Sequence, residues 1–145
     1  MIAKQLLESV PFFWTFTDEE KELLLSLDNY FESFKQGELI IQEGAQDTAL
    51  YIILKGNAYV TKSSHPKKII ATLTPGTVVG EISFLTQRAR STNVIAADKM
   101  ICFTINGETM ADLSSQMQHK FKDQLIEILV QRLDTMNQTL VELAR

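Results

Sequence analysis

Apolar and polar positions follow three different patterns along the chain. Up to residue 28 the apolar positions recur at helical spacing, with a first helix over 2–10 that Pro11 ends. Thr17 and Glu20 then form a T-x-x-E capping box ahead of a second helix. From 29 to 105 the pattern changes to short β-rich runs, and from 106 to 145 it is helical again. The order indicates a mainly β body flanked by helices.

The central region predicts eight strands between turn residues. Pro75-Gly76 fits the centre of a type II turn, because proline presets φ at the second position and glycine takes a positive φ at the third. Several short strands with closely spaced turns are typical of a small sandwich or roll. The strand-forming runs cover 30–34, 39–42, 50–54, 58–61, 69–73, 78–79, 92–96 and 101–105.

The last region predicts a short helix capped by Asn106 and a long one running to about Leu143, with Ser115 and Gln118 as its capping box. The apolar face of the long helix narrows after Asp134. We therefore expect its first part to pack on the roll and its second part to pair with a second chain as a coiled coil; a helix laid wholly on its own sheet is the alternative. The seam for this homodimer is Ile126, Leu129, Leu133, Met136, Leu140 and Leu143.

Composition narrows the classes of function. The 145 residues amount to one domain, and a net charge of −4 without a basic tract weighs against non-specific nucleic-acid binding. The longest apolar run, 49–54, is too short to cross a membrane. The single Cys102 and the lack of a signal peptide fit a cytoplasmic protein with Cys102 in its core. Only two histidines, His65 and His119, are present, so we expect no metal site and no catalytic residues.

The segment 79–91 has the features of an anion site. A strand ends at Val79, and Gly80 opens a short helical turn whose backbone N–H groups favour an anion. Arg90 returns at the start of the next strand with a planar fork suited to phosphate oxygens, and Ser91 adds a hydroxyl. The implied ligand carries one phosphate.

Glu81 would be repelled by that phosphate, so it fits an acceptor for a neighbouring sugar hydroxyl and a charge partner for Arg90 when the site is empty. Apolar residues around the segment could receive a base: Val60, Ile70, Val79 and Ile82.

This segment resembles the phosphate-binding cassette of the cyclic-nucleotide-binding domain, shared by the catabolite activator protein, protein kinase regulatory subunits and cyclic-nucleotide-gated channels. The cassette here is Gly80-Glu81-Ile82-Ser83-Phe84-Leu85, then a loop without the frequent glycine or proline, then Arg90-Ser91. KQGELIIQEG (35–44) and ALYIILKGNAYV (49–60) resemble the β-roll signatures, and PFF (11–13) the helical lead-in. The resemblance covers nearly the whole chain.

The resemblance implies an α+β, mainly β fold: an antiparallel β-roll (a double-stranded β-helix, or jelly roll) with N-terminal helices and a long C-terminal helix. The whole chain, 1–145, would be one domain, with a lead-in over 1–28, a roll over 29–105 that holds the cassette, and helices over 106–145. Glu81 would bind the ribose 2′-hydroxyl. Arg90 would bind the cyclic phosphate, aided by Ser91 and the backbone N–H groups near Ile82 and Ser83.

The function that the resemblance implies is a non-catalytic intracellular receptor whose ligand acts through the long helix, where Asn137 could reach the base. The Arg-Ser pair resembles the catabolite activator pattern and favours cAMP over cGMP. An effector protein is an expected partner. We expect no direct DNA binding by this chain, because no recognition helix follows the seam within these 145 residues. The alternatives are a dimeric scaffold with a vestigial pocket and, less favoured, a small β-roll enzyme.

Overall fold

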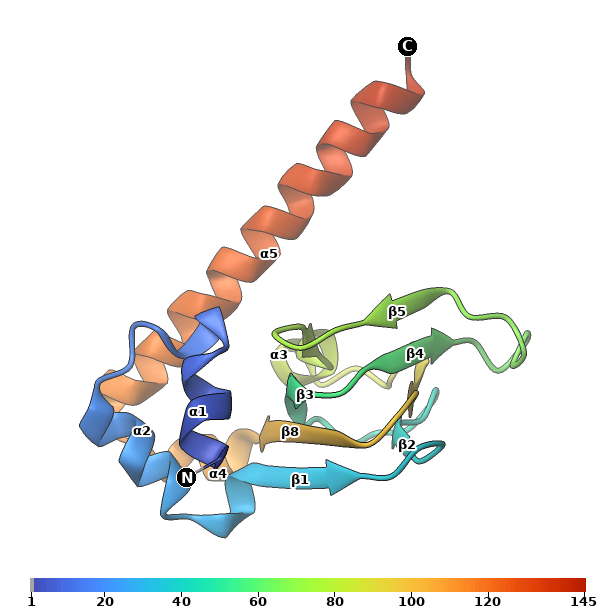
Figure 1. The fold of residues 1–145 in the computed structure, drawn as a ribbon. Coiled ribbons are helices and arrows are strands. Elements are labelled where there is room, and N and C mark those ends of the chain that lie inside the picture. Colours follow the sequence, from blue (N-terminus) through green and yellow to red (C-terminus); the bar gives the residue numbers. More distant parts are fainter. Residues whose placement is uncertain (1) are drawn as a thin grey trace. The chain divides into compact units, whose positions relative to one another are not determined.

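The eight β-rich runs form eight strands in the computed structural model, which describes residues 2–145 (Figure 1). The strands make two four-stranded antiparallel sheets, in the orders β1-β8-β3-β6 and β2-β7-β4-β5. The antiparallel roll and the α+β class are confirmed. The strands are β1 (Phe31–Phe34), β2 (Leu39–Ile41), β3 (Leu50–Lys55), β4 (Ala58–Thr61), β5 (Ala71–Leu73), β6 (Val78–Val79), β7 (Asn93–Ala96) and β8 (Met100–Ile105).

The core of the roll is built from inward-facing residues of both sheets. On β8, Met100 and Cys102 belong to the core cluster of the roll, whereas Phe103 on the opposite face is buried against Phe13 and Tyr30, so both faces of this strand are covered. Val94 and Ala96 on β7 belong to the same cluster as Cys102. Cys102 is therefore a core residue, as predicted, and burial raises the pKa of its thiol to about 12.

The lead-in consists of α1 (Ile2–Glu8), the 3-10 turn η1 (Pro11–Phe13), α2 (Asp18–Leu25) and the 3-10 turn η2 (Asp28–Tyr30). The predicted capping box forms: the Thr17 hydroxyl accepts from the Glu20 N–H at 3.1 Å, and the Glu20 carboxylate accepts from the Thr17 N–H at 2.8 Å. The first helix ends at Glu8, earlier than predicted. Val10 is extended, with φ −103° and ψ 121°, as expected for a residue before proline.

An aromatic cluster joins the lead-in to the roll. The Tyr30 and Phe103 rings stack at 5.7 Å, and Phe13 meets Phe103 edge-on at 5.1 Å. The Tyr30 hydroxyl donates to the Thr109 carbonyl at 2.9 Å, which ties in the short helix α4 (Gly107–Ala111). Figure 1 shows α1, α2 and α4 at the end of the roll where β8 finishes and β1 begins.

The chain divides into two compact units, residues 1–112 and 113–145, and the second contains α5 (Ser115–Leu143). Asn106 caps α4 as predicted. The prediction for the start of α5 was wrong by one residue, since Ser114 rather than Ser115 is the cap and accepts from the Met117 N–H at 3.2 Å. Ser114 is extended, with φ −61° and ψ 156°, so its hydroxyl reaches a free N–H of the first turn.

Burial changes along α5. Met117, Phe121 and Leu125 are buried. The large apolar side chains from Ile126 onward are mostly exposed: Ile126, Val130, Leu133, Met136, Leu140, Val141 and Leu143 are each 50% exposed or more. Leu129 is half-buried. No helix among residues 2–145 is both long and apolar enough to cross a membrane.

Candidate functional site

The predicted helical turn after β6 forms as α3 (Glu81–Thr86), and Gly80 is its N-cap. Gly80 is in the left-handed region, with φ 82° and ψ 11°. A Cβ at this position would lie 2.7 Å from Nη1 of Arg90 and 2.8 Å from the carbonyl oxygen of Ala49. Glycine is required both by the backbone conformation and by the space. The first-turn N–H groups that follow, including those of Ile82 and Ser83, have no acceptor within the helix.

Arg90 is buried, at 4% exposure, and the protein holds its guanidinium from three directions. Nη1 donates to the Gly80 carbonyl at 3.1 Å. Nη2 donates to the Ala49 carbonyl at 2.6 Å and to Oδ2 of Asp47 at 2.9 Å. The backbone N–H of Arg90 donates to the Ala45 carbonyl at 2.9 Å. The loop before β3 therefore accepts hydrogen bonds from both the backbone and the side chain of Arg90.

The carboxylate paired with Arg90 is Asp47, whereas the sequence predicted Glu81 in this role. Glu81 is the first residue of α3, where a carboxylate favours the positive end of the helix dipole. Asp47 lies in the same loop as Ala49, whose carbonyl also binds the guanidinium. Sequence reasoning missed Asp47 because 43 residues separate it from Arg90, and no local spacing relates the two.

One donor of Arg90 has no acceptor. Within residues 2–145, Nε of Arg90 is a buried side-chain atom without a hydrogen-bond partner. A buried unsatisfied N–H costs roughly 1–3 kcal/mol. An anion that entered from this side would supply the missing acceptor. Because Asp47 already balances the guanidinium charge, such an anion would be held by directed N–H donors rather than by net charge alone.

The end of the cassette is tied to the β4–β5 hairpin. Nζ of Lys62 donates to the Ser91 carbonyl at 2.7 Å and pairs with Glu43 at 3.7 Å. Glu43 also accepts from the Ser63 N–H at 2.9 Å, and its own N–H donates to the Asn93 side chain at 2.8 Å. Sequence reasoning missed this network, since its members come from three segments that lie far apart in the sequence. It fixes the backbone at Ser91 and leaves the exposed Ser91 side chain outside the core.

In the loop that lacks glycine, Gln87 adopts a backbone conformation that is typical of glycine. Gln87 ends α3 in the left-handed region, with φ 63°, and its N–H donates to the Ser83 carbonyl at 2.9 Å. Glycine is the usual residue at this position of a helix end. Arg88 is exposed, as predicted for a solvated loop charge.

The predicted cassette residues differ in burial. Ser83 is buried at 4% exposure, Gly80 and Glu81 are partly buried, and Ile82 is 50% exposed. Gly80 and Arg90 are brought into direct contact.

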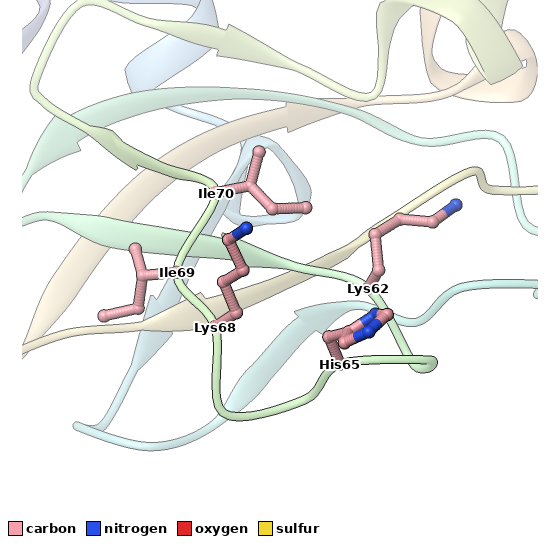
Figure 2. A pocket seen from close by; sticks show the side chains of 5 residues that line it. All are labelled: Lys62, His65, Lys68, Ile69 and Ile70. Carbon is pink, nitrogen blue, oxygen red and sulfur yellow. The ribbon is translucent and has the colours of Figure 1, made fainter.

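The residues predicted to receive a base are dispersed over several elements. Val79 is partly buried and packs against the core of the roll, and Val60 on β4 is also partly buried. Ile70 is 53% exposed and lines a hollow on the β4–β5 hairpin, where Figure 2 shows it with Lys62, His65, Lys68 and Ile69. Asn137 is an exposed residue of α5, in the second unit.

The electrostatics beside the ion pair involve Tyr51. Burial, assisted by Glu32 and Asp47, raises the pKa of the Tyr51 phenol to about 12, and Arg90 acts in the opposite direction. Tyr51 is therefore a neutral core residue at physiological pH. In the described part of the chain, no group of three or more His, Cys, Asp or Glu residues is arranged to hold a metal ion.

The sequence of the chain is similar to one known protein family and to individual proteins of known sequence. Residues 31–117 match the family model described as the cyclic nucleotide-binding domain. A cGMP-dependent protein kinase of Eimeria tenella is 30% identical over 129 residues, which cover 88% of this chain and 12% of the kinase. The chain therefore spans only a small part of that relative.

Two solved structures are also similar. The catabolite activator protein of Thermus thermophilus superposes with a TM-score of 0.73 at 26% identity, over 92% of this chain and 63% of that one. The regulatory subunit of a cAMP-independent protein kinase A from Trypanosoma brucei superposes with a TM-score of 0.66 at 27% identity, over 86% of this chain and 43% of that one.

Proposed function

We propose that this chain, which belongs to the cyclic nucleotide-binding domain family, is a non-catalytic receptor that binds a cyclic nucleotide in the cassette of residues 79–91. The observation that carries the proposal is the buried Nε of Arg90, which lacks an acceptor although Nη1 and Nη2 of the same guanidinium both bond to the protein. A phosphate oxygen supplies that acceptor. It also suits the first-turn N–H groups of Ile82 and Ser83, which have no acceptor within the helix.

Each cassette residue then has a role in the proposal. Arg90 and the N–H groups near Ile82 and Ser83 hold the cyclic phosphate, and the Ser91 hydroxyl adds a donor. Glu81 accepts from the ribose 2′-hydroxyl. The base lies against the apolar residues Val60, Ile70 and Val79.

The proposed ligand is cAMP, on the basis of the Arg90-Ser91 pair. cGMP is the competing candidate, because the Eimeria tenella relative is a cGMP-dependent protein kinase and the Ser91 hydroxyl can also bond to a guanine. Both ligands share the cyclic phosphate and the 2′-hydroxyl. Only the base distinguishes them, so the test must include both.

The second candidate function is a scaffold with a vestigial pocket. The ion pair with Asp47 favours it, since that pair satisfies the charge of Arg90 without any ligand. The similar structure from Trypanosoma brucei is the regulatory subunit of a protein kinase A that is named cAMP-independent, so a similar fold occurs in a protein with that name. The unsatisfied Nε favours the receptor function. In a purely structural arginine, a buried donor without an acceptor would only lower the stability of the fold.

We also propose that α5 is the output element and that it forms a homodimer through Ile126, Leu129, Leu133, Met136, Leu140 and Leu143. Most of this seam is exposed, at 58–77% for five of its six residues. An exposed apolar stripe of this length on a helix calls for a partner. A ligand that binds the protein more tightly in one arrangement of α5 shifts the population toward that arrangement. A cytoplasmic effector protein then binds the favoured arrangement.

The test is a calorimetric titration of the chain with cAMP, cGMP and 5′-AMP. The proposal predicts heat from at least one cyclic nucleotide and none from 5′-AMP, whose phosphate is not closed into the ring. The base preference follows from the ratio of the two dissociation constants. If neither cyclic nucleotide gives heat at millimolar concentration and at two temperatures, the scaffold function replaces the receptor.

A further inference from the structure

The strand β5 is an open edge of its sheet. It is the outermost strand in the order β2-β7-β4-β5, and its strand partner in the described part of the chain is β4, with Val60 opposite Ala71 and Ala58 opposite Leu73. Residues 69–72 are exposed. An open edge presents backbone N–H and C=O groups that can pair with another extended chain.

The hairpin that leads into β5 is basic, although the chain as a whole is acidic. Residues 57–80 contain no aspartate or glutamate, yet they include Lys62, Lys67, Lys68 and His65, whereas the whole chain carries a net charge of −4. Lys62 is engaged by Glu43 and by the Ser91 carbonyl. Lys67 and Lys68, just before the strand, are exposed. The hairpin therefore attracts negative charge next to unpaired backbone groups.

Two exposed apolar residues lie between the lysines and the strand. Ile69 is 49% exposed and Ile70 is 53% exposed. A hollow of about 330 Å³ is lined by Lys62, His65, Lys68, Ile69 and Ile70. Figure 2 shows Ile69 and Ile70 pointing to opposite sides of the chain, as successive side chains do in an extended segment. The edge thus offers apolar contacts on both faces of any strand added to it.

We propose that the β4–β5 hairpin, residues 62–73, is a docking site for an extended acidic segment of a partner protein, which adds to β5 as a further strand. The backbone of the segment pairs with β5, its acidic side chains face Lys67 and Lys68, and its apolar side chains contact Ile69 and Ile70. The site lies outside the cassette of residues 79–91 and shares only Ile70 with the proposed base contacts, and it does not rest on nucleotide binding.

Two other occupants fit the observations less well. A second copy of this chain, pairing edge to edge through β5, would offer Lys67 and Lys68 no acidic partner from its own hairpin, because residues 57–80 contain no aspartate or glutamate. An anionic membrane would use the lysines but not the open backbone edge, and Ile69 and Ile70, on opposite sides, cannot both enter one lipid surface.

The experiment uses the whole chain and a fluorescein-labelled seven-residue peptide of four valines followed by three glutamates, and binding is measured by fluorescence anisotropy at about 150 mM salt. When the peptide pairs antiparallel to β5, both of its faces carry acids beside the lysines and apolar side chains beside the isoleucines. Three comparison probes separate the contributions of charge, backbone pairing and lipid binding. The first is the same sequence with lysine in place of the acids. The second is the acidic peptide N-methylated at alternate amides, made in both registers, which keeps the charge but cannot pair as a strand. The third is vesicles of phosphatidylcholine with 30% phosphatidylserine.

The matched variants are the pair Lys67→Glu with Lys68→Glu, and the control pair Lys55→Glu with Lys122→Glu, which makes the same charge change at exposed positions outside the hairpin. We expect the acidic peptide to bind, and the Lys67/Lys68 reversal to weaken it about tenfold or more while the control pair changes it less than twofold, because salt screens charges beyond about 8 Å. At least one N-methylated register should not bind. Circular dichroism shows that each variant is folded.

The proposal is overturned if the acidic peptide does not bind, in which case the lysines only keep copies of the edge apart. It is equally overturned if both N-methylated peptides bind as well as the parent, or if the vesicles bind and the peptide does not, which would assign the hairpin to a lipid surface. Repeating the titration with cAMP and cGMP present separates this result from the nucleotide site, since the proposal holds whether or not either nucleotide binds.

Discussion

Nη2 of Arg90 lies 2.9 Å from Oδ2 of Asp47, and the two side chains differ widely in exposure, at 2% for the arginine and 50% for the aspartate. The guanidinium is thus a buried charge whose balancing carboxylate reaches it from the surface. Removing the carboxylate would leave the arginine buried with only neutral acceptors, which is costly, although solvent at the half-exposed Asp47 reduces the penalty.

Replacing Asp47 with Asn should therefore lower the free energy of unfolding by about 1–3 kcal/mol, as measured by urea denaturation. The matched control is Glu22→Gln, which neutralises the carboxylate of the Lys4–Glu22 pair at 2.8 Å, where both side chains are more than a third exposed. That control should have a much smaller effect, because ion pairs between exposed side chains contribute little to stability. Equal effects of the two substitutions would contradict the account of Arg90 as a buried charge that depends on Asp47.

Gly80 and Gly76 both have a positive φ but differ in their surroundings. A Cβ at Gly76, where φ is 94°, meets nothing within 4 Å, whereas at Gly80 it meets Arg90 and the Ala49 carbonyl. We expect Gly76→Ala to cost about 1–2 kcal/mol from backbone conformation alone. Gly80→Ala should cost clearly more and should also displace Arg90. Thermal unfolding measures both, and a smaller loss for Gly80→Ala would argue against the close contact.

Stability should fall at high pH because two buried groups resist ionisation. The pKa of Cys102 rises from 9.0 to about 12, and that of Tyr51 from 10.0 to about 12. Between those values the unfolded chain loses protons that the folded chain keeps, so the free energy of unfolding decreases as pH rises from about 9 toward 12.

The decrease attributable to Cys102 should be on the order of 2 kcal/mol by pH 11. Urea denaturation at pH 8, 9.5 and 11 measures it, and Cys102→Ala should flatten the pH dependence while lowering stability at pH 8, where the thiol is protonated in both states. A Cys102→Ala protein with the same slope as wild type would show that the thiol does not titrate with unfolding.

The dimer proposed for α5 predicts that the apolar seam controls association. Leu133 is 58% exposed, and replacing it with Glu would place a charge in the seam. We expect sedimentation equilibrium to show a dimer for wild type and a dissociation constant at least about tenfold higher for Leu133→Glu. Gln131→Glu, an exposed position off the seam, should leave association unchanged. A wild-type chain that is monomeric at all concentrations would rule out this homodimer.

Local features of the sequence were enough to predict much of the fold. Alternation and turn residues identified all eight strands, and Thr17 with Glu20 and Asn106 marked two helix starts, because each signal lies within a few residues. The start of α5 was missed by one residue, since Ser114 and Ser115 are adjacent and only the backbone conformation decides which one caps. The run 69–73 was shortened to Ala71–Leu73, where the ladder with β4 forms.

The candidate site was only partly predictable, for a different reason. Gly80 and Arg90 are ten residues apart, so a turn and a return strand suffice to bring them together. Asp47 approaches Arg90 only through the packing of the loop before β3, and Lys62 approaches Ser91 only through the β4–β5 hairpin. Such contacts depend on tertiary structure. Glu81, which belongs to the same cassette, was predicted to pair with Arg90, whereas the ion pair in the structure is with Asp47.

The central claim, that Arg90 is a ligand-binding residue and not only a structural ion-pair partner, is tested most directly by thermal unfolding with cAMP, cGMP and 5′-AMP. The proteins are wild type, Arg90→Lys, which keeps the charge but not the planar fork, and Arg88→Lys, the same change at an exposed loop position. A ligand that binds only the folded state stabilises it by about 2.7 kcal/mol at a hundredfold excess over its dissociation constant. We predict a rise in the midpoint with a cyclic nucleotide, unchanged in Arg88→Lys, lost in Arg90→Lys and absent with 5′-AMP. A midpoint that no nucleotide raises, together with a destabilised Arg90→Lys protein, would contradict the receptor and leave Arg90 as a structural residue.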